Sequence, residues 1–236
     1  MVTGLIVALD VAQAAEALTL ANKLRPIVDG FKVGLELLAG PGPAVIGAVR
    51  ELGLPVFVDA KLHDIPNTVE AAASRLGAYG ARWLTVHASG GGPMIEAATR
   101  GLARGADGHE AGILAVTVLT SLDAADLAQT GVSGSPGSQV ARLARLAASA
   151  GAEGVVCAVR ELGDVAQVAP GLTRFTPGVR PAGADAGDQA RVATPEEAAR
   201  RGADYVVVGR PIIASPDPEE AARSIRRQLE GAATGG

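Results

Sequence analysis

The sequence predicts an α/β protein with one domain, a (β/α)8 (TIM) barrel, and two observations predict it. Short apolar runs alternate with alanine-rich amphipathic stretches from one end of the chain to the other, which is typical of βα units on a parallel sheet. Eight such units can be counted in 236 residues. Open sheets usually have fewer strands, whereas the closed barrel places eight in about 250 residues.

Each predicted strand is a short run rich in Val, Ile and Leu. In chain order the predicted strands are 5–10, 30–35, 55–61, 83–88, 113–120, 154–159, 173–178 and 205–209. Between them lie helix candidates such as 11–24, 43–52, 68–79 and 218–229. The barrel domain is expected over residues 1–230, followed by a disordered tail at 231–236.

Glycine and proline clusters divide these units at 40–43, 90–93 and 133–137, and they predict loops rather than domain boundaries. The longest loop candidate is 180–192, after the seventh strand, where glycines, alanines and two aspartates predict a mobile lid.

Composition excludes several classes of protein. The net charge is −4 with no basic stripe, so nucleic acid is not an expected partner. No uncharged apolar segment approaches about 18 residues, so no membrane span is expected. The N-terminus lacks the basic leader of a signal peptide. The single cysteine, Cys157, lies in an apolar run and has no internal disulfide partner, which fits a reducing compartment. We expect a cytoplasmic protein.

Three charges stand at the end of the third predicted strand. Asp59 and Lys61 point to the same side of that strand, because successive side chains alternate. Asp64 follows closely. Buried charges are costly unless they are paired, so function is the expected reason for keeping them there. The chain has three lysines against eighteen arginines. A lysine at a strand end therefore indicates chemistry that needs an ammonium group.

Polar residues follow the other strands too. The carboxyl ends of barrel strands form the active-site face, so these residues are expected to meet at one mouth. They are Asp10, Lys32, Asp59, Lys61, His87, Thr120, Ser121, Arg180, Gly209 and Arg210. Each of these residues, taken alone, could have a purely structural role. Asp10, for example, could cap the helix predicted at 11–24.

The eighth strand predicts a phosphate site. Gly209 permits close backbone approach, and Arg210 offers a bidentate fork beside a helix N-terminus. The loops after strands seven and eight often build such a site. Arg180 and Gln189, in the seventh loop, are expected to close over the same phosphate. The sequence therefore predicts a phosphorylated substrate.

The segment Asp59-Ala-Lys61-Leu-His-Asp64-Ile-Pro-Asn-Thr68 resembles the Asp-x-Lys-x-x-Asp signature of the orotidine 5′-phosphate decarboxylase family. Further segments match in the family's order: 8–10, 31–34, 119–121, 177–180, 188–189 and 208–211. This resemblance implies a homodimeric barrel with active sites near the interface. It also implies conversion of orotidine 5′-phosphate to uridine 5′-phosphate and carbon dioxide without metal or cofactor.

The resemblance also implies a role for each matched residue. Lys61 is the proton donor, Asp59 its charged neighbour, and Lys32 the cation on the other side. Asp64 and Thr68 reach into the partner's site. Asp10 contacts the ribose, Thr120 or Ser121 the base, and the phosphate is held by Arg180, Gln189, Gly209 and Arg210.

Two alternatives remain open. A sister branch shares the motif but acts on sugar phosphates through a magnesium-stabilised enediolate. Its enzymes place a Glu in the second strand, where this chain has Lys32 and a cation would repel magnesium. A noncatalytic barrel that binds a phosphorylated metabolite would need the phosphate residues but not Lys61. The three histidines have no metal-ligand spacing; His63 is expected at a surface or interface, His87 as an orienting hydrogen-bond partner.

Overall fold

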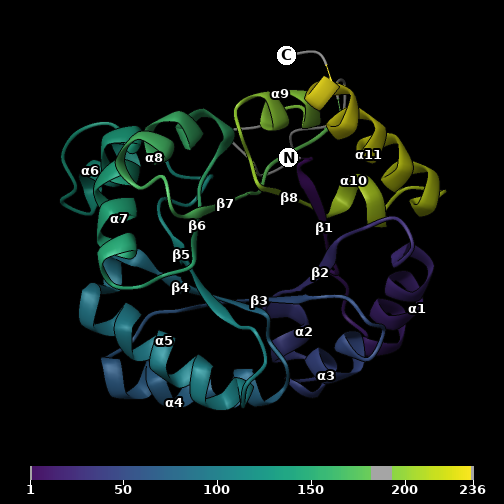
Figure 1. Cartoon of the computed structure of the whole chain (residues 1–236), viewed down its shortest axis with the longest axis horizontal. Helices are drawn as coiled ribbons and strands as arrows, with labels where there is room; N and C mark the ends of the chain where they lie inside the picture. Colours follow the sequence, from purple (N-terminus) through teal and green to yellow (C-terminus); the bar gives the residue numbers. More distant parts are fainter. Residues whose placement is uncertain (1, 182–192, 235–236) are drawn as a thin grey trace.

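The computed structural model describes residues 2–181 and 193–234. Eight parallel strands close into a barrel in chain order, β1 to β8. The ring closes because β1 pairs with β2 on one side and with β8 on the other. Helices surround this ring on the outside (Figure 1). The predicted (β/α)8 barrel is confirmed.

The elements have the following bounds. The strands are β1 Gly4–Ala8, β2 Gly30–Val33, β3 Val56–Leu62, β4 Trp83–His87, β5 Gly112–Val116, β6 Gly154–Val156, β7 Thr173–Thr176 and β8 Tyr205–Val208. The α-helices are α1 Ala14–Leu24, α2 Leu35–Ala39, α3 Ala44–Arg50, α4 Pro66–Ala78, α5 Gly92–Ala106, α6 Ala124–Gln129, α7 Pro136–Ser149, α8 Leu162–Val168, α9 Pro195–Arg200, α10 Arg210–Ile213 and α11 Pro218–Thr234. Two short 3₁₀ helices cover Ala88–Gly90 and Val159–Glu161.

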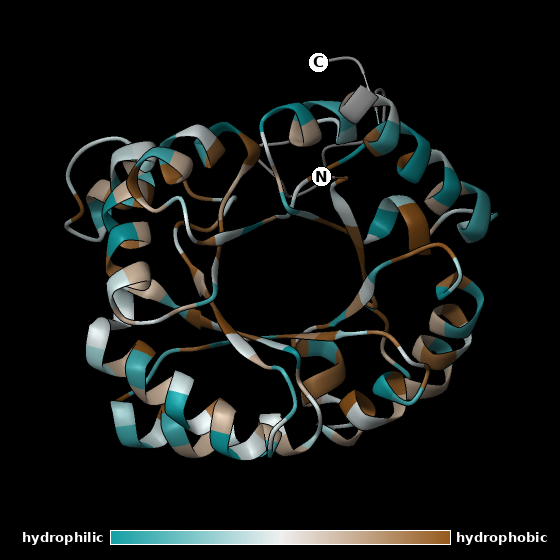
Figure 2. Cartoon of the chain, in the orientation of Figure 1, coloured by the Kyte–Doolittle hydropathy of each residue, from teal (hydrophilic) through white to brown (hydrophobic). Residues whose placement is uncertain are grey.

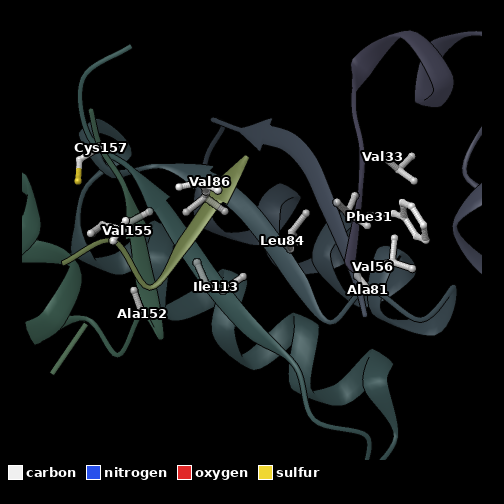
Figure 3. Packing of buried hydrophobic residues seen from close by; sticks show 14 of the residues in the cluster. Phe31, Val33, Val56, Ala81, Leu84, Val86, Ile113, Ala152, Val155 and Cys157 are labelled. Atoms are coloured by element: carbon white, nitrogen blue, oxygen red, sulfur yellow. The ribbon is translucent and has the colours of Figure 1, made fainter. Parts of the chain in front are cut away.

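Two layers of apolar side chains follow from the alternation along the strands. The larger lies between the strands and the helices, where Val33, Leu84, Ile113 and Val155 are fully buried (Figure 3). The helices accordingly turn apolar residues inward and polar residues outward (Figure 2).

The second apolar layer fills the barrel interior near the start of the strands. Phe175 packs against Phe57, Trp83 and Tyr205 with ring centroids 5.6, 5.0 and 4.6 Å away. Aromatic residues are only 3% of the chain, yet four of them meet here. Their bulk occupies the N-terminal half of the barrel, which places any interior cavity toward the opposite mouth.

Several predicted boundaries need correction. Strand β5 ends at Val116 rather than at residue 120, so Thr120 and Ser121 lie in a loop. The expected loops at 90–93 and 133–137 contain helix starts, because proline is well suited to the first helical turn. Helix α11 continues to Thr234 and so overlaps the segment predicted as a tail. In the described part of the chain, no helix is long and apolar enough to cross a membrane.

Candidate active site

An alternating row of charges crosses the barrel mouth. Lys32 on β2 donates to Asp10 Oδ1 at 3.0 Å, and its Nζ lies 3.5 Å from Asp59 Oδ2. Lys61, two residues beyond Asp59 on β3, donates to the same Asp59 Oδ2 at 2.8 Å. These four residues, Asp10, Lys32, Asp59 and Lys61, are called the charge array below. Their formal charges sum to zero, which makes the close packing of charged groups tolerable.

Asp59 is the centre of the charge array. Its side chain is only 13% exposed. Burial raises the pKa of this carboxyl, but the ammonium groups of Lys32 and Lys61, with hydrogen bonds from Lys61 and Thr85, outweigh burial and hold the pKa below its usual value. Asp59 is therefore ionised at neutral pH and fixes both ammonium groups around it.

Helix α1 begins later than predicted, and this decides the role of Asp10. The residue before the helix is Gln13 rather than Asp10. Asp10 does not cap the helix; its carboxylate lies against Lys32 instead. The capping interpretation of Asp10 is wrong.

Lys61 has an unusual backbone. Its φ is +48°, a value that among the described non-glycine residues recurs only at Asp107, at the end of α5. The pairing of β3 with β4 shifts register between Val58 and Leu62. Strand irregularities of this kind re-aim side chains beside active sites. Here the register shift and the positive φ of Lys61 occur in the segment whose Lys61 ammonium donates a hydrogen bond to Asp59.

A cavity of about 270 Å³ opens beside the array. Lys32, Asp59 and Lys61 line one side of it, and Thr120 and Ser121 line the loop side. Its remaining walls are mostly apolar: Phe57, Val116, Val118, Leu119, Val156, Cys157, Pro177 and Val207. A flat, largely apolar ring with polar edges fits such a space. We call it the base cavity.

A smaller cavity of about 110 Å³ adjoins the base cavity and shares Lys32, Pro177 and Val207 with it. Gly178, Arg180, Gly209 and Arg210 contribute to its lining, and α10 begins at Arg210. Within the described residues the buried Nε of Arg180 has no hydrogen-bond partner. Guanidinium groups and glycine backbone suit an anion, so we call this the anion cavity. The predicted Gln189 lies outside the described residues.

Three of the residues to which the resemblance assigns a role line neither cavity: Asp10, Asp64 and Thr68. Asp64 and Thr68 are exposed. Asp64 accepts a hydrogen bond from the backbone N–H of Ile65 at 2.6 Å. Ile65 itself is 67% exposed.

His63 and His87 lie together, with ring centroids 5.5 Å apart. Burial, and then the proximity of His63 and Lys61, lowers the pKa of His87, with Asp59 acting in the opposite direction. His87 is therefore neutral at neutral pH, able to donate and accept one hydrogen bond. In the described ranges no cluster of His, Cys, Asp and Glu has the arrangement of a metal site.

Sequence reasoning missed two residues that support the array. Gly34 follows β2, and a Cβ placed there would lie 2.8 Å from Lys32 Nζ and 3.1 Å from Asp10 Oδ1. Thr85 on β4 bonds both Asp59 and the backbone of Lys61. Thr85 did carry a signal, because it shares the inward face of its strand with Trp83 and His87.

A larger cavity, of about 370 Å³, lies at the other end of the barrel. Its lining comes from the loops that precede β3, β4 and β5, and from the ends of α3, α4 and α5. None of the predicted site residues lines it. Size alone therefore does not identify the functional cavity in this fold, whose chemistry sits at the carboxyl ends of the strands.

Comparison with known proteins agrees with this geometry. The model of the orotidine 5′-phosphate decarboxylase / HUMPS family matches residues 3–225. The orotidine 5′-phosphate decarboxylase of Anaeromyxobacter sp. (strain K) is 55% identical over 223 residues, covering 94% of this chain and 96% of the relative. The enzyme of that name from Paramagnetospirillum magneticum is 48% identical over 239 residues, covering 97% and 99%.

Among solved structures, orotidine 5′-phosphate decarboxylase from Lactobacillus acidophilus superposes with a TM-score of 0.82 at 35% identity, covering 96% of this chain and 99% of that one. The match extends over all eight βα units rather than over the motif alone. This chain belongs to the orotidine 5′-phosphate decarboxylase / HUMPS family.

Proposed function

We propose that this protein decarboxylates orotidine 5′-phosphate to uridine 5′-phosphate, in pyrimidine biosynthesis, with Lys61 as the proton donor. The observation that carries the proposal is that three members of the charge array, Lys32, Asp59 and Lys61, line the base cavity. The anion cavity adjoins this base cavity. The curated relatives that bear this enzyme's name support the choice of substrate.

The two cavities suit the two ends of this nucleotide. The pyrimidine fits the base cavity, with a hydroxyl of Thr120 or Ser121 at its polar edge. The 5′-phosphate fits the anion cavity, where Arg180 and Arg210 supply positive charge and Gly209 a close backbone. Asp10, at the mouth and bonded to Lys32, is in reach of the ribose between them. Gln189 remains a proposed phosphate contact.

The array then supplies the chemistry. Breaking the bond between C6 and the carboxylate releases carbon dioxide and leaves the electron pair on C6 of the pyrimidine. This carbanion has little resonance stabilisation, so a fixed cation is the most effective help. The Lys61 ammonium provides that charge and then donates a proton to C6, after which the neutral amine recovers a proton from water. Asp59 holds the ammonium in place throughout.

Phosphate binding can contribute to catalysis although the phosphate lies far from the reacting carbon. Energy from contacts remote from the reacting carbon can orient the substrate and close a loop over it. The lid predicted at 180–192 begins at Arg180, and residues 182–192 of it lie outside the described residues. Losing a phosphate contact should therefore lower turnover as well as affinity.

Lys32 disfavours the magnesium-dependent alternative. Its ammonium lies 3.0 Å from Asp10 and 3.5 Å from Asp59, between the two carboxylates that would be the nearest ligands for a divalent ion. A cation held there repels magnesium. We therefore propose a reaction without metal or cofactor.

We further propose that the enzyme is a homodimer in the cytoplasm. Asp64 and Thr68 are exposed beside the apolar Ile65, at the edge of the mouth, and a second copy would bury all three. Asp64 and Thr68 would then complete the partner's active site. Cys157 is buried and is the single cysteine of the chain, so it forms no internal disulfide, which fits a reducing compartment.

The test is an absorbance assay with orotidine 5′-phosphate on protein first treated with a chelator and desalted. We expect turnover unchanged by this treatment. Loss of activity that magnesium restores would support the sister branch instead. Phosphate-dependent binding without turnover would support the noncatalytic barrel.

A further inference from the structure

The hydroxyl of Thr85 has a fully determined hydrogen-bonding pattern. Thr85 is inaccessible to solvent, on β4 next to the charged strand β3. Its Oγ1 accepts from the backbone N–H of Lys61 at 2.9 Å and lies 3.0 Å from Asp59 Oδ1. Because an ionised carboxylate has no proton, the one hydroxyl proton of Thr85 must be donated to Asp59.

This arrangement gives the two carboxylate oxygens of Asp59 different hydrogen-bond partners. Oδ1 is held by Thr85, while Oδ2 faces Lys61 Nζ at 2.8 Å and Lys32 Nζ at 3.5 Å. With Oδ1 fixed, the carboxylate cannot rotate to share both oxygens among the ammonium groups. Both lysines are therefore drawn to one oxygen.

The same hydroxyl also holds the Lys61 main chain. A φ of +48° is unfavourable for a residue with a side chain and persists only where the surroundings impose it. Thr85 Oγ1 accepts a hydrogen bond from the backbone N–H of Lys61. One buried hydroxyl thus fixes Lys61 at its backbone and, through Asp59, at its ammonium. Thr85 does not line the base cavity and so acts through these two residues.

We propose that Thr85 is a positioning residue for Lys61, one that sets where the ammonium stands relative to C6 without touching the substrate. This proposal rests on the proposed decarboxylation. Misplacing a reacting group by a fraction of an ångström lowers turnover far more than it lowers binding. The loss should therefore fall on kcat.

The test compares Thr85→Val, which keeps the shape and removes the hydroxyl, with Thr85→Ser, which keeps the hydroxyl. We expect kcat of Thr85→Val to fall about 10- to 100-fold, as for loss of a hydrogen bond to a buried charge. Thr85→Ser should stay within about threefold of wild type, with KM and the affinity for uridine 5′-phosphate nearly unchanged in both variants.

A matched control separates positioning from stability. Thr3→Val removes another buried hydroxyl, one that donates to the Ala203 carbonyl at 2.8 Å near the start of β1, away from the mouth. It should lower the melting temperature without lowering kcat. If Thr85→Val does not fold, Thr85→Ala takes its place in the comparison with Thr85→Ser.

Three results would overturn the proposal. They are a wild-type kcat in the folded variant without the hydroxyl, an equal loss in Thr85→Ser, and a parallel loss of uridine 5′-phosphate binding. Failure of the proposed function looks different, because wild-type protein would then not turn over orotidine 5′-phosphate at all.

Discussion

At the residue scale, a missing side chain is as important to the array as the charged ones. Gly34 has an ordinary negative φ, so its glycine is not explained by the backbone. It is explained by space: a Cβ there would approach Lys32 Nζ to 2.8 Å and Asp10 Oδ1 to 3.1 Å. Glycine at position 34 lets Lys32 lie between its two carboxylates.

We therefore expect Gly34→Ala to lower kcat about 10-fold, because the added Cβ moves the Lys32 ammonium away from Asp10 and Asp59. The measurement is steady-state decarboxylation, with circular dichroism to verify the fold. Gly47→Ala is the control; its Cβ would meet the nearest atom, Tyr79 O, at 3.7 Å, an ordinary contact. Equal activity of the two variants would show that Lys32 does not need the space.

The sequence predicted the residues of the charge array but not Thr85 and Gly34, which help to position them. Strand alternation places Asp59 and Lys61 on one side, and the strand ends bring in Lys32 and Asp10. Thr85 and Gly34 have commonplace interpretations in a strand and in a loop. The contact of Thr85 with Lys61 depends on the irregular register between β3 and β4 and on the positive φ of Lys61. The reason for Gly34 is seen only in how closely Lys32 Nζ and Asp10 Oδ1 surround it.

At the element scale, helices α4 and α5 pack unusually closely. A Cβ built at Gly101 or Gly105 of α5 overlaps the backbone carbonyl oxygen of Glu70 or Ser74 on α4. Arg100 and Arg104 of α5 donate to Glu70 at 3.2 and 2.8 Å across the same contact. Since α4 follows the Asp64 loop directly, this contact positions the segment proposed to meet the partner.

Gly101→Ala should lower the free energy of unfolding by about 1–3 kcal/mol, because the backbone of α4 has to shift. Gly163→Ala, on α8, is the matched control. Apart from its chain neighbours and the backbone of its own helix, no described atom lies within 4 Å of its added Cβ, and alanine is the better helix former by about 1 kcal/mol. Urea unfolding measures both. A Gly101→Ala variant as stable as Gly163→Ala would contradict the close packing.

Helix starts were harder to predict than helices. The segments 90–93 and 133–137 carry glycine and proline, which mark turns and first helical turns alike. Ser135 resolves the second case, since its hydroxyl accepts from Ser138 N–H at 3.2 Å and caps α7. A Ser-Pro pair before an apolar periodicity was the available signal.

At the scale of the whole molecule, the count of βα units was sufficient to predict the closed barrel. The association of subunits cannot be predicted from this count, because it depends on contacts with a second copy of the chain. Asp64 and Thr68 lie outside the cavities of their own chain, which is what a shared site requires. The homodimer and the cytoplasmic location stay predictions.

Mixing subunits tests the shared site. Lys61→Ala and Asp64→Ala proteins should each be weakly active alone. In a heterodimer one site carries both lesions and the other carries neither, so random mixing should restore about a quarter of wild-type activity. The control is to mix two preparations of Lys61→Ala. No recovery, with heterodimers demonstrated by tag capture, would show that Asp64 does not serve the partner.

The central claim is that Lys61 delivers charge and a proton to C6, and Lys61→Ala tests it most directly. The measurement is decarboxylation of orotidine 5′-phosphate, with uridine 5′-phosphate affinity and circular dichroism as controls, and with Lys23→Ala, on the exposed face of α1, as the matched lysine variant. We predict a loss of more than about 1,000-fold in kcat for Lys61→Ala alone. A folded, nucleotide-binding Lys61→Ala protein that turns over at close to the wild-type rate would contradict the account.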